Sequence, residues 1–192
     1  MRTNAMAKAQ IVEPVQSMTR AEYRAWSERQ PIGRFERIDG VVVAKAPERV
    51  EHNDRKMRAW LALRRAVRDA NAPCHVNGDG MTVEIGDSDH EPDAILYCGP
   101  KLPPGSTTVS NPLIIVEVLS PSTSATDRAW KLREYFRLPS VRHYLIIWAD
   151  REQVVHHRRN DAGAIETTVA TSGEIGLDPP QIGITVEEIY AD

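Results

Sequence analysis

The sequence predicts an α/β (α+β) fold, in which a mixed central β-sheet with an N-terminal β-hairpin is flanked by helices. Three patterns support this class. Asp39-Gly40 separates two β-prone runs, as in a tight hairpin. Residues 50–71 show helical periodicity. Residues 113–148 follow the order strand, helix, strand, and such a crossover joins parallel strands, so the sheet combines parallel and antiparallel pairs.

The chain has 192 residues, of which 41% are hydrophobic and 27% are charged. This length and balance suit one globular domain with a single sizeable core. We assign that domain to residues 18–192 and expect residues 1–17 to be a flexible tail. The tail lacks the apolar core of a signal sequence, and no apolar run approaches the length of a membrane span. We therefore expect a soluble, cytoplasmic protein.

The first half of the domain is expected to open with a short helix. Thr19 and Glu22 match a capping box, and the helix is predicted to end near Arg29. The two hairpin strands follow at 34–38 and 41–43. On the helix over 50–71, four apolar residues share the face that we expect to pack on the core: Met57, Trp60, Leu61 and Val67.

The second half is expected to consist mostly of strands. They are predicted at 74–76, 81–85, 92–97, 113–119 and 143–148, with a terminal hairpin of 153–158 and 164–170. The connections include a polar turn over 86–91, a proline-rich loop over 99–112, a helix over 126–138 and a last short helix capped by Thr185. The run 113–119 is apolar on both faces, which indicates a central strand covered on both sides.

Composition narrows the class of site. Cys74 and Cys98 lack the spacing of a structural zinc site, and we expect two buried thiols, with a disulfide as the alternative. The net charge of −3 and the pI near 6.1 count against strong non-specific DNA binding but leave room for a local basic face. His156 and His157 point to opposite faces of one strand and are interpreted as structural residues rather than metal ligands.

Glu117 is the most informative residue, because it interrupts six aliphatic residues in the predicted central strand. A buried carboxylate without a partner is strongly destabilising or becomes protonated. Glu117 is therefore expected to meet a cation or a basic side chain. The plain structural alternative is that it reaches solvent or an ion pair at the end of its strand.

Asp93 follows Pro92 at the start of another predicted strand, and Pro-Asp taken alone is a common turn dipeptide. It gains meaning as a partner of Glu117. Two carboxylates at the ends of adjacent strands can hold Mg²⁺, which prefers oxygen ligands and retains several waters, and Mn²⁺ can replace it. The carbonyl of Val118 is a candidate third ligand.

Three further residues are candidates, each with a plain alternative. Lys131 lies one turn after Asp127, either as half of a surface ion pair or as an ammonium that holds a phosphate or orients water. Glu36 is either an exposed hairpin residue or part of the site. His52 is either a surface residue at the start of a helix or a catalytic group.

These parts suit phosphodiester hydrolysis, which needs an activated water and neutralisation of a developing negative charge. Carboxylate-held Mg²⁺ can supply both, and a lysine can assist. Ser120 and Ser122 do not form the G-x-S-x-G elbow of a serine hydrolase. The sequence also contains neither a P-loop nor G-x-G-x-x-G, so nucleotide-driven chemistry has no support.

Five segments resemble, in the same order, those of one family: "MTRAEYRAW", "GRFERIDGVVV", "EPDAILY", "LIIVEVLSPSTSATDRAWKLREYF" and "VRHYLIIWAD". Between about Met18 and Arg159 the chain resembles the Uma-type restriction endonucleases, formerly a domain of unknown function. That family lies within the PD-(D/E)XK nuclease superfamily. The segment from Glu117 to Lys131 is the most specific part of the resemblance.

The resemblance implies a restriction-endonuclease-like sheet and a Mg²⁺-dependent endonuclease that acts on DNA. It implies that Asp93 is the aspartate of the PD element and Glu117 the acidic residue of (D/E)XK. Leu119 stands where that motif has its lysine. In the family the next helix supplies the lysine, and Lys131 matches that position. Two lesser matches are a hairpin glutamate and a helix-opening histidine, Glu36 and His52.

Other hypotheses stay open beside the endonuclease. One is a non-catalytic module that keeps the nuclease fold and binds nucleic acid or a protein, which the acidic pI and the displaced lysine favour. Another is a structural domain in a homodimer, with the buried strands and the terminal hairpin as the interface. For the endonuclease, the basic helix face over 55–68, with Arg128 and Arg133, is a candidate surface for the DNA backbone.

Overall fold

The computed structural model describes residues 17–119 and 125–191, and the side chains of residues 125–127 are not described. The predicted tail lies outside the described residues apart from Ser17, which forms a β-bridge with Val41. Ser120 and Ser122 also lie outside them. Within these two ranges, no helix is both long enough and apolar enough to cross a bilayer.

The central sheet is mixed, as predicted. Its strands stand in the order β10-β9-β8-β7-β6-β3, and only β7 and β8 are parallel. Their bounds are β3 (Cys74–Gly78), β6 (Ala94–Cys98), β7 (Ile114–Leu119), β8 (His143–Trp148), β9 (Val154–Arg159) and β10 (Ile165–Ala170). The predicted crossover thus joins β7 to β8 through α3 (Ala125–Tyr135), which confirms the prediction made from 113–148.

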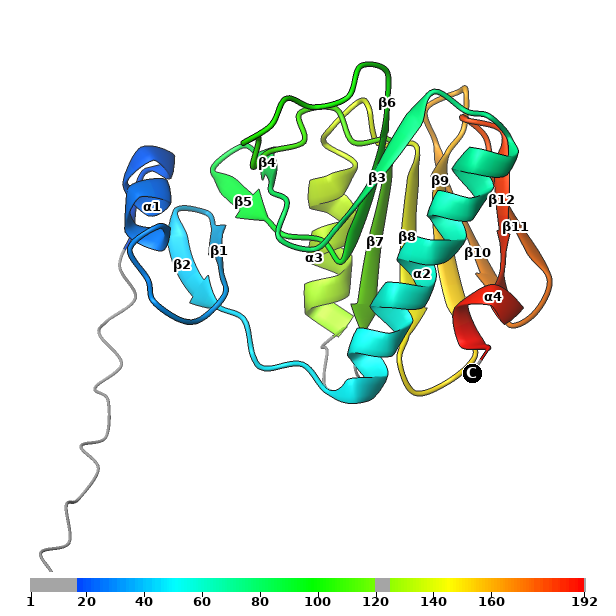
Figure 1. Cartoon of the computed structure of the whole chain (residues 1–192), viewed down its shortest axis with the longest axis horizontal. Helices are drawn as coiled ribbons and strands as arrows, with labels where there is room; N and C mark the ends of the chain where they lie inside the picture. The colour runs from blue at the N-terminus through cyan, green and yellow to red at the C-terminus, as the bar shows by residue number, and fades with distance from the viewer. Residues whose placement is uncertain (1–16, 120–124, 192) are drawn as a thin grey trace, which may run out of the picture.

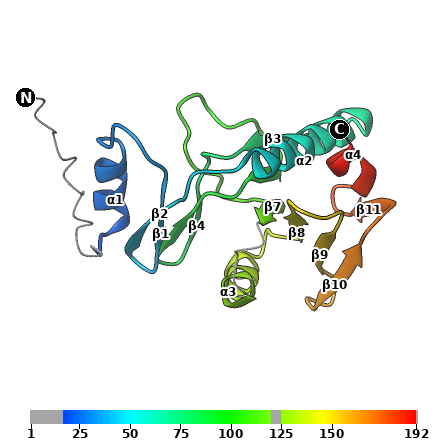
Figure 2. The same ribbon diagram turned by 90° about the horizontal axis from the view of Figure 1, so that it is seen from below.

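Helices cover both faces of this sheet (Figures 1 and 2). One face carries α2 (Val50–Asp69) and the short α4 (Val186–Tyr190), and the opposite face carries α3. Thr185 caps α4 as expected, with its side chain accepting a hydrogen bond from the Glu188 amide at 3.1 Å. The strands β11 (Glu174–Leu177) and β12 (Ile182–Thr185), which were not predicted, form a hairpin on the α2 side.

The N-terminal hairpin belongs to a second, four-stranded sheet in the order β2-β1-β5-β4. The predicted hairpin is confirmed as β1 (Phe35–Ile38) and β2 (Val41–Ala44), next to α1 (Arg20–Ser27). The other two strands are β4 (Val83–Ile85) and β5 (Ser88–His90). Residues 86–91 were expected to be a polar turn, and the prediction was wrong in part, because β5 lies within them.

The strand β5 is buried although its residues are polar, and two arginines from elsewhere in the chain pair with Asp89 at its centre. Asp89 is 2% exposed, and its Oδ2 accepts a hydrogen bond at 2.6 Å from Nε of Arg37, which is fully buried. Nε of Arg20 reaches the other oxygen of Asp89 at 2.6 Å. These partners are 52 and 69 positions away in the sequence, so no local pattern of hydrophobicity could indicate the strand.

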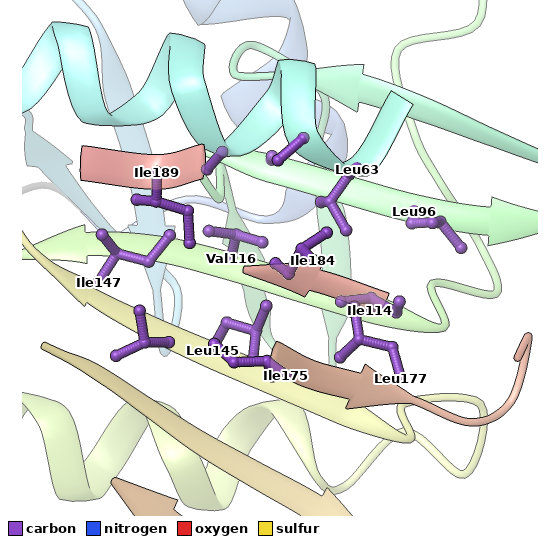
Figure 3. Close-up of a cluster of buried hydrophobic side chains, with 14 of the residues drawn as sticks. Leu63, Leu96, Ile114, Val116, Leu145, Ile147, Ile175, Leu177, Ile184 and Ile189 are labelled. Carbon is purple, nitrogen blue, oxygen red and sulfur yellow. The ribbon is translucent and has the colours of Figure 1, made fainter. Parts of the chain in front are cut away.

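The buried face of α2 differs from the predicted one. Met57 and Leu61 are each 52% exposed, so the expectation that they pack on the core was wrong. Small residues form the buried face instead, and Ala59 and Ala62 let the helix approach β6 and β7 closely. Leu63 is fully buried beside them, and Figure 3 shows it among strand residues such as Leu96, Val116 and Ile184.

The two cysteines form a disulfide, which corrects the expectation of two buried thiols. Cys74 and Cys98 are register partners on the neighbouring strands β3 and β6, with their Cα atoms 3.8 Å apart. Only Cys74 is buried. The disulfide was not predicted because the two cysteines are 24 residues apart in the sequence, and only the antiparallel register brings them together.

Candidate active site

The two predicted carboxylates meet where β6 begins beside β7. Ala94 lies opposite Val116 in the ladder, so Asp93, just before β6, comes beside Glu117. The backbone of Asp93 donates to the Val116 carbonyl at 3.0 Å, and its Oδ2 accepts a hydrogen bond from the Val118 amide at 2.7 Å. Residues 24 positions apart along the chain are thus brought side by side, since the β-ladder aligns them.

Both carboxylates are buried, with exposed fractions of 5% for Asp93 and 4% for Glu117. Burial raises the pKa of Asp93 above its usual range, and the negative charge of Glu117 raises it further. Two neighbouring buried carboxylates repel each other, so the pair requires positive charge close by. The structure supplies that charge from both faces of the sheet.

From the α3 side, Lys131 and Tyr135 contact Glu117. Nζ of Lys131 lies 3.0 Å from Oε1 of Glu117, and the hydroxyl of Tyr135 donates to the same oxygen at 2.5 Å. Burial opposes ionisation of Glu117, but Lys131, Lys45 and the Tyr135 hydroxyl outweigh it and hold the pKa of Glu117 below its usual range. Lys131 and Glu117, both predicted as site residues, are therefore in direct contact.

From the α2 side, Lys56 and His52 approach Asp93. Nζ of Lys56 lies 3.4 Å from Oδ1 of Asp93, and Nε2 of His52 lies 3.9 Å from Oδ2. Lys56 is only 5% exposed and also contacts the carboxylates of Glu48 and Asp79. Its pKa is raised, since hydrogen bonds and charges from these acids outweigh the opposing effect of burial. Lys56 is thus a permanent positive charge beside Asp93.

The Val118 carbonyl, a candidate metal ligand, is also part of this arrangement. Nε2 of His52 lies 2.6 Å from its oxygen, and a carbonyl can only accept, so Nε2 carries the proton. Nδ1 then faces Glu48, 3.8 Å away. His52 is therefore hydrogen-bonded to the backbone of β7 next to Glu117 and is mostly buried, so it is not a surface residue.

Glu36 lies at the hairpin flank of the site. Its Oε1 accepts from the Glu91 amide at 2.9 Å and is 3.7 Å from Nζ of Lys45, which itself donates to the Glu91 carbonyl at 2.8 Å. The charge of Lys45 lowers the pKa of both Asp93 and Glu117. Glu36 is buried rather than an exposed hairpin residue, and it positions a lysine that faces the site.

Sequence reasoning did not find three residues that surround the carboxylates: Lys56, Tyr135 and Lys45. For two of them a signal existed. Lys56 follows His52 by four residues and so shares its helix face, and Tyr135 follows Lys131 by four in the same way. For Lys45 there was none, because its place depends on how the hairpin packs against β5.

The donor set fits a hard divalent cation. Among the residues that the structure describes, no three carboxylate, imidazole or thiol side chains gather as they would around a metal ion. The oxygens of Asp93, Glu117 and the Val118 carbonyl could instead provide the small protein contribution that Mg²⁺ accepts, because it retains several of its own waters. Zinc, which favours nitrogen and sulfur ligands, does not suit this set.

Comparison with known proteins agrees with this geometry. Residues 20–187 match the Uma2 family, described as "Putative restriction endonuclease". The chain belongs to this family. The Uma2 match covers all the residues of the candidate site, from Glu36 to Tyr135, and confirms the resemblance found in the sequence.

Similar proteins include two uncharacterized proteins of Synechocystis. One is 25% identical over 180 residues, covering 92% of this chain and 93% of the relative. The other is 26% identical over 151 residues, covering 78% and 85%. A crystal structure described as "a putative nuclease belonging to DUF820 from Anabaena variabilis" aligns with a TM-score of 0.69 at 15% identity, over 86% of this chain and 95% of that one. That likeness confirms the nuclease-like fold of this Uma2 protein.

Proposed function

We propose that this Uma2 protein is a Mg²⁺-dependent endonuclease that hydrolyses phosphodiester bonds of DNA, with Mn²⁺ as an alternative metal. One observation carries the proposal. Asp93 and Glu117 are buried side by side where β6 begins, and a lysine approaches each of them from a different face of the sheet. Membership of a restriction endonuclease family supports the reaction class.

In this proposal Asp93, Glu117 and the Val118 carbonyl hold the metal ion. When bound, Mg²⁺ supplies Lewis acidity and a water of lowered pKa. His52 donates to the Val118 carbonyl and fixes its orientation. Since a carbonyl oxygen has two lone pairs, the oxygen can serve both His52 and a metal.

Lys131 is the residue that faces the phosphate. Its ammonium lies 3.0 Å from Glu117, where a scissile phosphate or an attacking water would come close to the metal ligands. A positively charged group at this place would stabilise the negative charge that develops in the transition state, which is usually the largest single contribution to catalysis. Because Leu119 occupies the usual position of the lysine, α3 rather than β7 provides the ammonium.

The structure offers less support for a DNA-binding surface on α2 than for a metal site. Several basic side chains of α2 are engaged within the chain: Arg55 over Tyr190, Arg64 over Trp60, Arg65 with Glu188 and Arg68 with Asp69. The predicted use of the helix face over 55–68 therefore needs side chains that change partners. Lys131 contacts Glu117, and the charge of Lys45 acts on both carboxylates, so these two lysines are the first candidates for phosphate contacts.

The second candidate is a non-catalytic module with the nuclease fold. The net charge of −3 and the leucine at position 119 favour it. Such a module would bind nucleic acid or a protein without using the carboxylates. Metal binding that depends on Glu117 therefore distinguishes the two functions.

Nicking of supercoiled plasmid with Mg²⁺ or Mn²⁺ tests the proposal. The wild-type chain should nick, while Asp93→Asn and Glu117→Gln should reduce the rate by more than about 100-fold, because each removes a metal-binding charge. Asp161→Asn is the matched control, since Asp161 is 99% exposed and should keep wild-type activity. Equal rates in the wild type and in Asp93→Asn would refute the endonuclease.

A further inference from the structure

The outer face of α2 exposes a row of large apolar residues. Val50 is 75% exposed, and Met57 and Leu61 are each 52% exposed. Their spacing of seven and four residues places them in one stripe along the helix. Single exposed apolar residues are common on monomers, whereas several that share one face of a helix point to an interaction surface.

Charged residues on the same face have opposite signs at opposite ends of the helix. Asp54 and Arg64 are both exposed and lie equally far, five residues, on either side of Ala59. Met57 and Leu61 lie two residues on either side of the same position. Ala59 itself faces the core, so the centre of this outer stripe is directly opposite it.

We propose that two copies of this chain associate through the outer faces of α2, antiparallel, about a two-fold axis at the level of Ala59. A two-fold contact brings one patch onto itself, so each residue meets its counterpart across the axis. Met57 then packs on Leu61 of the second copy, and Asp54 pairs with Arg64 of the second copy. The helix has 20 residues and is about 30 Å long, which gives room for both sets of contacts.

A second copy suits this face better than a nucleic acid does. A phosphate backbone has no apolar surface that could cover Met57 and Leu61, and its negative charge is repelled by Asp54. A groove of about 910 Å³ continues the face between α2 and α4, and its charged lining consists of four arginines and two glutamates: Arg58, Arg64, Arg65, Arg68, Glu187 and Glu188. Mixed charge around an apolar centre is typical of a protein interface.

The proposed contact leaves the candidate active site open. His52 and Lys56 point from the inner side of α2 toward Asp93 of their own chain, on the side of the helix away from the stripe. Association through α2 is thus independent of the proposed endonuclease, and either can fail alone. It also replaces the terminal hairpin as the expected homodimer interface.

Charge-reversal variants test the proposal. Sedimentation velocity over a range of protein concentrations measures the dissociation constant of the dimer for each variant. Asp54→Arg and Arg64→Asp should each raise the dissociation constant of the dimer about tenfold or more, because each places like charges together twice in the dimer. An equimolar mixture of the two variants should restore association to within about threefold of the wild type, since both pairs become complementary again. Glu28→Arg, an exposed change at the C-terminal end of α1, is the control and should change nothing.

Intramolecular pairing cannot produce the rescue, because residues 54 and 64 are about 15 Å apart along one helix. A wild-type chain that stays monomeric at high micromolar concentration overturns the proposal. So does a mixture that remains as dissociated as the single variants. If the wild type is monomeric and Arg64→Asp alone weakens binding to a DNA duplex, the face binds nucleic acid instead. Circular dichroism should show native helix content in both variants.

Discussion

Nζ of Lys131 on α3 lies 3.0 Å from Oε1 of Glu117 in β7. This contact shows how a lysine reaches Glu117 although Leu119 occupies the position two residues after the glutamate. The ammonium reaches the carboxylate from the covering helix instead of from the strand. Lys131 is thereby tied to the acid that we propose as a metal ligand.

The first prediction concerns Lys131. Lys131→Met should lower kcat for plasmid nicking about 100- to 1,000-fold while metal binding persists, because the carboxylates remain and a charge-stabilising group is lost. Lys101→Met in the proline-rich loop is the matched control, since Lys101 is exposed and has no place in the candidate site. Single-turnover nicking rates and Mn²⁺ titrations measure the two effects separately. If Lys131→Met nicked at the wild-type rate, Lys131 would have only a structural role.

The second prediction concerns Lys56, which neutralises Asp93 and two further carboxylates. Lys56→Met should lower the free energy of unfolding by roughly 3 kcal/mol, because the buried carboxylate of Asp93 loses its counter-charge. Arg68→Met, at a side chain that is 72% exposed, should change it by less than about 0.5 kcal/mol. Urea denaturation measures both variants.

A double variant sharpens this test. In an Asp93→Asn background, Lys56→Met should cost less than in the wild type, since one of the acids that Lys56 serves has lost its charge. An equal cost in both backgrounds would show that the 3.4 Å approach of Lys56 to Asp93 contributes nothing to stability.

Much of this fold was predictable from the sequence, and the exceptions share a cause. The strand holding Glu117 stood out because a charge interrupts an aliphatic run, and the hairpin because of Asp39-Gly40. The strand β5 was missed because the partners of Asp89 come from remote arginines. A local sequence pattern predicts secondary structure from the residues nearby. Whether a polar residue is buried depends on partners that are distant in the sequence.

The site was predictable to the same degree. Glu117 was predicted because a carboxylate is unusual within an aliphatic strand, and Asp93 was predicted only as its partner. The ladder places the two side by side. Lys56 was missed because the buried face of α2 was judged from its large apolar residues, whereas Ala59 and Ala62 form it. Once small residues define the buried face, Lys56 falls on the inner side of the helix with His52.

The third prediction concerns pH and a pair of buried histidines. Nδ1 of His143 is 2.9 Å from Nε2 of His156, and Nε2 of His143 is 3.0 Å from the Pro179 carbonyl. The carbonyl requires a proton on Nε2 of His143, so its Nδ1 accepts from His156 and both rings are neutral. Burial lowers the pKa of each histidine from 6.5 to about 4.

The sign follows from proton binding. Between pH 6.5 and about 4 the unfolded chain binds protons at these positions and the native chain does not, so stability is complete above pH 6.5 and falls as the pH drops. Each of the two histidines should contribute a loss of roughly 3 kcal/mol over that range. His156→Gln should reduce the difference between urea midpoints at pH 7 and pH 4.5. A variant with the same pH dependence as the wild type would contradict this assignment.

The fourth prediction tests the central claim, that Asp93 and Glu117 jointly hold one divalent ion. Mn²⁺ titration followed by electron paramagnetic resonance should show one ion per wild-type chain. That ion should be lost in Asp93→Asn and also in Glu117→Gln, but retained in Asp161→Asn. Mn²⁺ binding by either single variant with the affinity of the wild type, or no binding by the wild type, would contradict the account.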